Sequence, residues 1–258
     1  MNRIDEIATG LAQDWWVRTA YRTLTGDEAP ADMAEAYAIQ AALQPMLAER
    51  RGPIAGRKIA LSSKAMQQMV GIDQPVAGAF FRNDILNSPA EVDLATFRHM
   101  GLECELAFVL GRDLPPGADL DKEKVLDAVA EVRPAFELIE DKDADYSAID
   151  ALTLVADNAW CGAVVLGGPL AGWRNLDLAN LPAELHQDGE PPEPTNTGAA
   201  DPISSLLWVL RHFHGLGQTV QAGETIITGS VVRTRFPALG DRFVYRISDL
   251  AEVELSIS

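Results

Sequence analysis

The stretch GLECELAF, residues 101–108, decides how the rest of this sequence is interpreted. In a β-strand, side chains alternate between two faces, so Glu103 and Glu105 point to the same side while the apolar residues of the stretch point to the other. Two carboxylates in this arrangement lie roughly 6 to 7 Å apart. At an effective dielectric constant near 20, they repel each other by about 2 to 3 kcal/mol. A strand that keeps such a pair needs a reason to do so.

A third acid suggests what the reason is. In RPAFELIED, residues 133–141, Glu137 stands between Phe136 and Leu138, and a carboxylate in such an apolar setting is rarely buried without a partner. Three carboxylates can share one cation, and hard oxygen ligands suit Mg²⁺ or Mn²⁺. The alternative is a solvent-facing strand of a half-exposed sheet, where alternating glutamates are common and bind nothing.

Composition limits the class of protein. The chain has 258 residues, 47% of them hydrophobic, and a formal charge of −17, which argues against nucleic acid and favours cations as partners. Cys104 and Cys161 have no metal-site spacing and are expected to be buried apolar residues. No apolar run approaches the roughly 20 residues of a membrane span, and the N-terminus lacks a signal-peptide core. We therefore expect a cytoplasmic protein with no membrane contact.

The pattern of hydrophobic residues changes near residue 52. Residues 1–52 read as a small helical region, and residues 53–258 as a β-rich domain of short apolar strands, which together predict an α+β fold. Helices are expected in the second part at 63–71, 122–140 and 201–217. No strand leads into a Gly-x-Gly-x-x-Gly turn, and no Gly-x-Ser-x-Gly motif occurs, which disfavours a dinucleotide fold and the commonest serine hydrolases.

Two further segments carry candidate groups. In GRKIALSSKAMQQMVGIDQP, residues 56–75, Lys58 lies within an apolar strand, and hydroxyl groups follow at Ser62 and Ser63 near a helix start. A lysine in that position either extends to solvent or faces a polar cavity with an anion. The charged run EDKDADY, residues 140–146, is interpreted as a solvated turn.

Five motifs together resemble one family. They are the 56–75 segment, ECELAFVLGRDLP, RPAFELIED, VADNAWCGAVVLGGP and AGETIITGS, in this order. They are similar to the 2-oxopent-4-enoate hydratase and 4-oxalocrotonate decarboxylase family within the fumarylacetoacetate hydrolase superfamily, and the resemblance covers nearly the whole chain. It implies a small N-terminal helical part before a mixed β-roll, one Mg²⁺ or Mn²⁺ per subunit, a small 2-oxo or 2-hydroxydienoate substrate from aromatic-ring catabolism, and a homo-oligomer.

The resemblance also implies roles for individual residues. The metal ligands fall on Glu103, Glu105 and Glu137, and the active-site lysine falls on Lys58. Ser62, Thr228 and Arg233 are expected to bind substrate, with Arg233 placed to meet a second carboxylate. The metal ion would draw together glutamates that otherwise repel, which explains why the strand keeps them.

Three departures from the family pattern bear on the reaction. Val76 stands where hydratases usually carry an acid. Trp160 follows the tripeptide Asp-Asn-Ala, where the family commonly has serine. Residues 200–202 read Ala-Asp-Pro in place of Gly-His-Pro. By chemistry alone, Val76 favours decarboxylation, since a hydratase benefits from an acid that positions water. KIALSSKAMQQ, residues 58–68, and ECELAFVLGRDLP, residues 103–115, resemble the hydratase branch more closely, and Asp73, Glu140 or Asp141 would be substitute acids.

We therefore predict a metal-dependent lyase, most simply a 2-keto-4-pentenoate-type hydratase. The alternatives are a 4-oxalocrotonate-type decarboxylase, an acylpyruvate carbon–carbon hydrolase, and a paralogue that binds a 2-oxo acid without turning it over because Trp160 fills the pocket.

Overall fold

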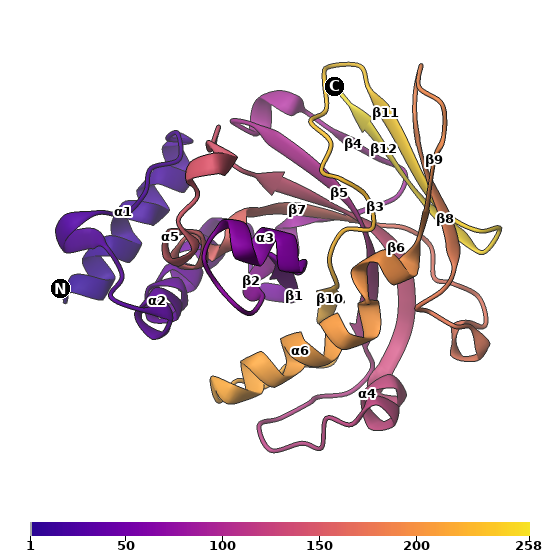
Figure 1. The fold of residues 1–258 in the computed structure, drawn as a ribbon, viewed down its shortest axis with the longest axis horizontal. Helices are drawn as coiled ribbons and strands as arrows, with labels where there is room; N and C mark the ends of the chain where they lie inside the picture. Colours follow the sequence, from indigo (N-terminus) through magenta and orange to yellow (C-terminus); the bar gives the residue numbers. More distant parts are fainter. Residues whose placement is uncertain (1) are drawn as a thin grey trace.

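The computed structural model describes residues 2–258, and a group of helices lies at one side of the molecule (Figure 1). α1 (Arg3–Val17) begins at Asn2, whose side chain accepts the Asp5 N–H, and α2 (Met33–Arg51) begins at Asp32 in the same way. Both are N-terminal caps that satisfy a free helix N–H. α1 packs on α2, and α5 (Ala151–Ala156) packs on the other side of α2. The N-terminal helices are thus tied to a segment 100 residues further along the chain.

A seven-stranded mixed sheet follows, in the order β2-β1-β10-β5-β6-β7-β3. Its longest strands are β5 (Met100–Leu110) and β6 (Val129–Glu140), which pair antiparallel at its centre. The other strands are β1 (Ile54–Ala60), β2 (Val76–Phe81), β3 (Ile85–Asn87), β7 (Cys161–Leu166) and β10 (Thr225–Ile227). Parallel pairing of β1 with β10 brings Gly56 beside Thr225, 169 positions later in the chain.

A second, five-stranded sheet lies at the opposite side from the N-terminal helices, in the order β4-β12-β11-β8-β9 (Figure 1). Its strands are β4 (Ala90–Val92), β8 (Pro182–Gln187), β9 (Glu193–Asn196), β11 (Arg242–Ile247) and β12 (Ala251–Ile257). The main core lies between the sheets, where Phe108 and Phe136 of the first share a buried cluster with Phe243 and Tyr245 of the second. The curled pair of sheets confirms the expected α+β class.

The helix expected over 122–140 is wrong beyond its first two turns. α4 (Lys122–Ala128) ends at Ala128, and the chain continues directly into β6. Val129, Val132 and Phe136 are fully buried against the core, and such β-branched and aromatic residues favour the extended chain. The difference matters for the site, because Glu137 is therefore a strand residue rather than a helix residue.

Two other helices complete the fold. α3 (Lys64–Met69) begins at Ser63, and α6 (Pro202–Gly215) begins at Asp201 with the proline in its first turn, both where the sequence predicts them. Across residues 2–258, the structure contains no helix with the length and apolar character that crossing a membrane demands.

Candidate functional site

The two central strands bring the three glutamates together. In the β5–β6 register, Glu103 lies directly opposite Glu137, and Glu105 follows on the same face of β5. One carboxylate oxygen from each residue lies within 4.8 Å of the others. Like charges directly opposite each other destabilise a sheet. This arrangement therefore indicates a built site rather than a solvated strand face, since Glu105 and Glu137 are completely buried.

Two oxygens of this cluster have no hydrogen-bond donor. Glu105 Oε1 and Glu137 Oε2 are buried and accept no hydrogen bond, whereas Glu137 Oε1 faces the Lys58 ammonium group. The remaining Glu105 oxygen accepts the Gly229 N–H at 2.6 Å, and Glu103 accepts the Thr234 hydroxyl at 2.5 Å. Burial, together with the neighbouring Glu137 and Glu103 charges, raises the pKa of Glu105 well above its ordinary value. Unpaired buried oxygens of this kind fit a hard divalent cation.

Lys58 supplies one compensating charge. It lies on β1, is 2% exposed, and its Nζ is 2.5 Å from Glu137 Oε1. Burial disfavours the ammonium group, but Glu137 and other nearby groups, Glu103 among them, together outweigh this effect, and the pKa of Lys58 lies above its ordinary value. Lys58 is therefore a cation and a hydrogen-bond donor here. Three carboxylates facing one ammonium group leave a formal charge of minus two when all are ionised, which a divalent cation neutralises.

A second contact of Lys58 comes from residues 157–160, called here the DNAW segment. Lys58 Nζ donates to Ala159 O at 3.0 Å. Asn158, Ala159 and Trp160 all have positive φ angles, of 58°, 50° and 61°, a conformation that costs free energy for residues other than glycine. Asn158 holds the segment in place, since its side chain accepts the Ala79 N–H and donates to Ala79 O on β2. Gly78 allows the close approach, because a Cβ atom there would lie 2.5 Å from Asn158 O.

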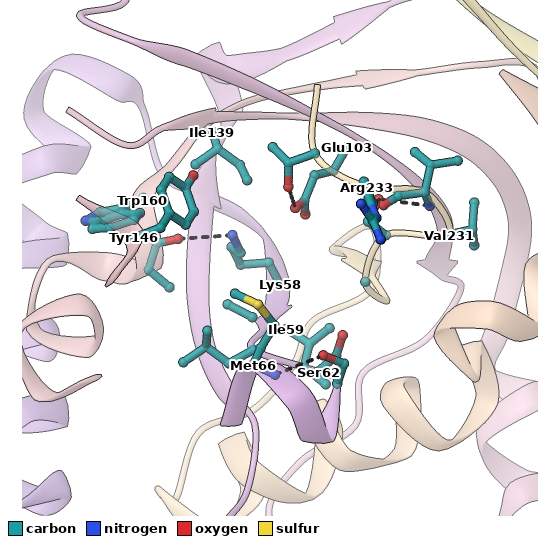
Figure 2. A pocket seen from close by; sticks show the side chains of 18 of the residues that line it. Lys58, Ile59, Ser62, Met66, Glu103, Ile139, Tyr146, Trp160, Val231 and Arg233 are labelled. Carbon is teal, nitrogen blue, oxygen red and sulfur yellow. Dashed lines mark hydrogen bonds between the residues drawn. The ribbon is translucent and has the colours of Figure 1, made fainter. Parts of the chain in front are cut away.

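A cavity of about 820 Å³ opens beside these groups, and Figure 2 shows its lining. Lys58, Glu103, Ser62 and Arg233, all candidate site residues, line it. Arg233 is exposed and makes no ion pair within residues 2–258, so its guanidinium group is available to a ligand. Thr228 is placed differently: it is fully buried beside the cavity and its hydroxyl donates to Leu106 O at 2.9 Å.

The departures from the family pattern take specific positions. Val76 is fully buried in a cluster with Tyr37 and does not line the cavity. Asp73 is exposed and also lies outside the lining. Trp160 forms part of the wall, yet a cavity of about 820 Å³ remains, so this side chain does not fill the pocket.

The EDK run is not a solvated turn. Glu140, Asp141 and Lys142 are 6%, 0% and 3% exposed. Each of the three side chains has hydrogen-bond or ion-pair partners in other segments of the chain. Glu140 accepts the N–H groups of residues 98, 99 and 142. Lys142 Nζ is 2.6 Å from Asp157 Oδ2, at the start of the DNAW segment.

Asp141 leads to a lining residue that the sequence did not reveal. Its Oδ2 accepts the hydroxyl of Tyr146, which lines the cavity. Glu193 on β9 also lines the cavity and pairs with Arg235. Neither residue stands in a recognisable motif, and the Glu193–Arg235 pair joins segments 42 residues apart in the chain.

Comparison with known proteins places this site in a class. Residues 65–258 match the family model of the fumarylacetoacetate (FAA) hydrolase C-terminal domain. The chain belongs to this family, whose fold here carries a buried three-glutamate cluster.

Its relatives narrow the class further. The chain is 35% identical over 222 residues to a 2-keto-4-pentenoate hydratase of Paraburkholderia xenovorans (strain LB400), covering 85% of this chain and 81% of the relative. It is 30% identical over 236 residues to a 4-oxalocrotonate decarboxylase of Pseudomonas putida, covering 89% and 87%.

A solved structure also matches over the full length. The 4-oxalocrotonate decarboxylase from Pseudomonas putida G7, complexed with magnesium and adipate, superimposes with a TM-score of 0.90 at 25% identity, covering 100% of this chain and 99% of that chain. The same enzyme has been crystallised with calcium and acetate. The expected fold type is confirmed.

Proposed function

We propose that the chain is a divalent-metal-dependent lyase that acts on 2-oxo and 2-hydroxydienoate acids of aromatic-ring catabolism, as a hydratase of the 2-keto-4-pentenoate type. The observation that carries this is the buried glutamate cluster, which holds oxygens without a hydrogen-bond donor, lies beside a lysine and reaches the cavity through Glu103. The hydratase and decarboxylase names of the relatives support it.

Glu103, Glu105 and Glu137 would hold Mg²⁺ or Mn²⁺. Such an ion supplies Lewis-acid stabilisation of the negative charge that develops on the C2 oxygen of a 2-oxo acid as it enolises. Lys58 would donate a hydrogen bond to the substrate from its position beside Glu137. Ser62 would contact the substrate from the α3 side of the cavity. Thr228 would act indirectly, since its hydroxyl donates to Leu106 O on β5, the strand that carries Glu103 and Glu105.

A decarboxylase is the second candidate, and Arg233 is the observation that favours it. Its guanidinium group lines the cavity without an ion pair in the described chain, which suits a second carboxylate on the substrate. The structural neighbour in this class is complexed with adipate, a dicarboxylate. We keep hydratase first because Val76 packs away from the cavity, so its apolar side chain does not form a dry wall against a leaving carboxylate.

The test supplies 2-hydroxypenta-2,4-dienoate and 2-oxohex-3-enedioate separately with Mg²⁺, and follows ultraviolet absorbance and CO₂ release. Loss of absorbance from the first substrate without CO₂ supports the hydratase. Release of CO₂ from the second with no action on the first would reverse our order. An acylpyruvate is supplied as a third compound, and its cleavage would assign a carbon–carbon hydrolase. Return of all three compounds unchanged would assign a binding protein.

We also propose a homo-oligomer in the cytoplasm. Sedimentation velocity checks the first, with a mass that is a multiple of 27.9 kDa as the expected result. Fractionation of the source cells checks the second.

A further inference from the structure

Tyr146 is the only phenol that lines the cavity among residues 2–258. It begins the short 3₁₀ turn Tyr146–Ala148, and its ring stands between Trp160 and Lys58 on one side of the cavity (Figure 2). Trp160 meets the ring edge to face at 6.3 Å between centroids, and Phe236 does so at 6.2 Å. These contacts hold the ring at the wall, and they do not require a hydroxyl group.

The hydroxyl has a separate, buried partner. Tyr146 Oη donates to Asp141 Oδ2 at 3.0 Å, and Asp141 is completely buried. The other oxygen of Asp141 lies 2.7 Å from His99 Nδ1 and also accepts the Asp143 N–H at 3.0 Å. The His99 side chain is 41% exposed. A continuous chain of hydrogen bonds therefore runs from the solvent-exposed imidazole to the cavity wall.

The phenol is set up as a hydrogen-bond acceptor toward the cavity. Its own proton is directed to Asp141, which leaves lone pairs of Oη for a donor inside the cavity. Burial and the adjacent carboxylate raise the pKa of Tyr146 above its ordinary value, so the phenol stays protonated. Such a group moves a proton by exchange along the chain rather than as a free phenolate.

The carboxylates near the cavity in residues 2–258 are otherwise engaged or lie outside its lining. The Glu140 carboxylate already accepts hydrogen bonds from backbone N–H groups, and Asp73 and Val76 lie outside the cavity lining. Glu193 lines the cavity but is paired with Arg235. The cluster glutamates are the expected metal ligands.

We propose that Tyr146, held by Asp141 and His99, is the catalytic residue that accepts the proton of the attacking water. This rests on the proposed hydratase function. The water oxygen bonds to C4 of the α,β-unsaturated 2-oxo acid while one O–H bond breaks and its proton passes to Tyr146 Oη. The phenolic proton moves to Asp141 Oδ2 in the same step.

The electron pair of C3=C4 moves toward C2, and the C2 carbonyl becomes an enolate. The relay then runs backward: Asp141 returns its proton to Tyr146, and Tyr146 delivers the extra proton to C3 as the carbonyl re-forms. One water is added across C3=C4 overall, with OH at C4 and H at C3.

The experiment measures hydration of 2-hydroxypenta-2,4-dienoate with Mg²⁺ by wild type, Tyr146→Phe, Asp141→Asn and Tyr21→Phe. Phenylalanine keeps the ring contacts of Tyr146 and removes only the hydroxyl. Tyr21 is the matched control, because it also meets Trp160 edge to face, at 5.1 Å, but does not line the cavity. A second readout is deuterium exchange at C3 of 2-oxopentanoate in D₂O, which needs enolisation but no addition of water.

We expect Tyr146→Phe to lower kcat by about 10² to 10⁴-fold, with little change in KM, and to slow C3 exchange in parallel, because Tyr146 carries the proton at C3. Asp141→Asn should lower kcat in the same direction, and Tyr21→Phe should match wild type. Unchanged kcat in Tyr146→Phe, or loss of hydration with C3 exchange at the wild-type rate, would overturn the relay. A wild-type protein that exchanges C3 hydrogens but hydrates no dienoate would overturn the hydratase function itself and the relay with it.

Discussion

At the scale of single residues, the site is a balance of buried charges. Among residues 2–258, Lys58 is the lysine that pairs with the glutamate cluster, 2.5 Å from Glu137 Oε1. Removing one partner of a buried ion pair leaves the other uncompensated, at a cost of roughly 3 to 5 kcal/mol. A bound divalent cation would supply the compensation that the lysine otherwise provides.

Lys58→Met therefore has two expected results. Turnover falls by about 10² to 10⁴-fold, because a hydrogen-bond donor to the substrate is lost. The free energy of unfolding falls by roughly 3 to 5 kcal/mol in EDTA and by clearly less in saturating Mg²⁺. Denaturant unfolding under both conditions measures this. Equal destabilisation with and without Mg²⁺ would show that the lysine and the metal do not share Glu137.

The sequence predicted these residues unequally, for physical reasons. Glu103 and Glu105 share a face because a strand has a period of two, which a local pattern reveals. The relation of Glu137 to them depends on the β5–β6 register, and the local pattern was mistaken for a helix. Tyr146 was not foreseen at all, since its position depends on Asp141 and on His99, which is 42 residues before Asp141.

At the scale of elements, the DNAW segment depends on contacts with two distant parts of the chain. Asp157 accepts Lys142 Nζ at 2.6 Å and the Trp15 Nε1–H of α1 at 2.7 Å. Lys142 also lies 4.3 Å from the centre of the Trp15 ring. Burial raises the pKa of Asp157, although Lys142 opposes the shift. The N-terminal helix thus stabilises the strained segment that holds Lys58.

Lys142→Met should destabilise the protein by roughly 3 to 5 kcal/mol, because it leaves the Asp157 carboxylate buried with no cation. Adding Asp157→Asn should recover part of that loss, since the amide carries no charge. Urea unfolding of the single and double variants gives the comparison. A double variant no more stable than Lys142→Met would contradict the assigned pair.

Helix α6 carries a group that makes stability depend on pH. His212 packs against Trp208 and Tyr37, and burial, with the nearby Arg57 charge, lowers its pKa to about 4. The unfolded chain therefore binds more protons than the folded chain between its ordinary pKa near 6.5 and the lowered value. Stability contributed by neutral His212 is present above pH 6.5 and is lost as the pH falls toward 4.

His212→Phe should reduce this loss by roughly 1 to 2 kcal/mol, a figure that allows for the partial exposure of the ring. The measurement is the free energy of unfolding of both proteins from pH 7 to pH 4.5. If the free energies of unfolding of the variant and the wild type fell equally across that pH range, His212 would not titrate as described.

At the scale of the whole molecule, the fold gathers three of the chain's many acidic residues into one glutamate cluster. The net charge is −17, but the glutamate cluster is distinguished by burial and by oxygens without donors. Ordinary surface acids of this chain, such as Glu131 on β6, pair with arginine or face solvent. The sheet order places the cluster at the centre of the long strands, where composition alone does not locate it.

Calorimetric titration with Mg²⁺ and Mn²⁺ tests the central claim most directly. Wild type and Glu131→Gln, a substitution on the same strand six residues before Glu137, should each bind one ion per chain. Glu105→Gln keeps the shape of the site and removes one buried charge, so it should lose that binding. Equal binding by wild type and Glu105→Gln, or no binding by wild type, would contradict the three-glutamate metal site.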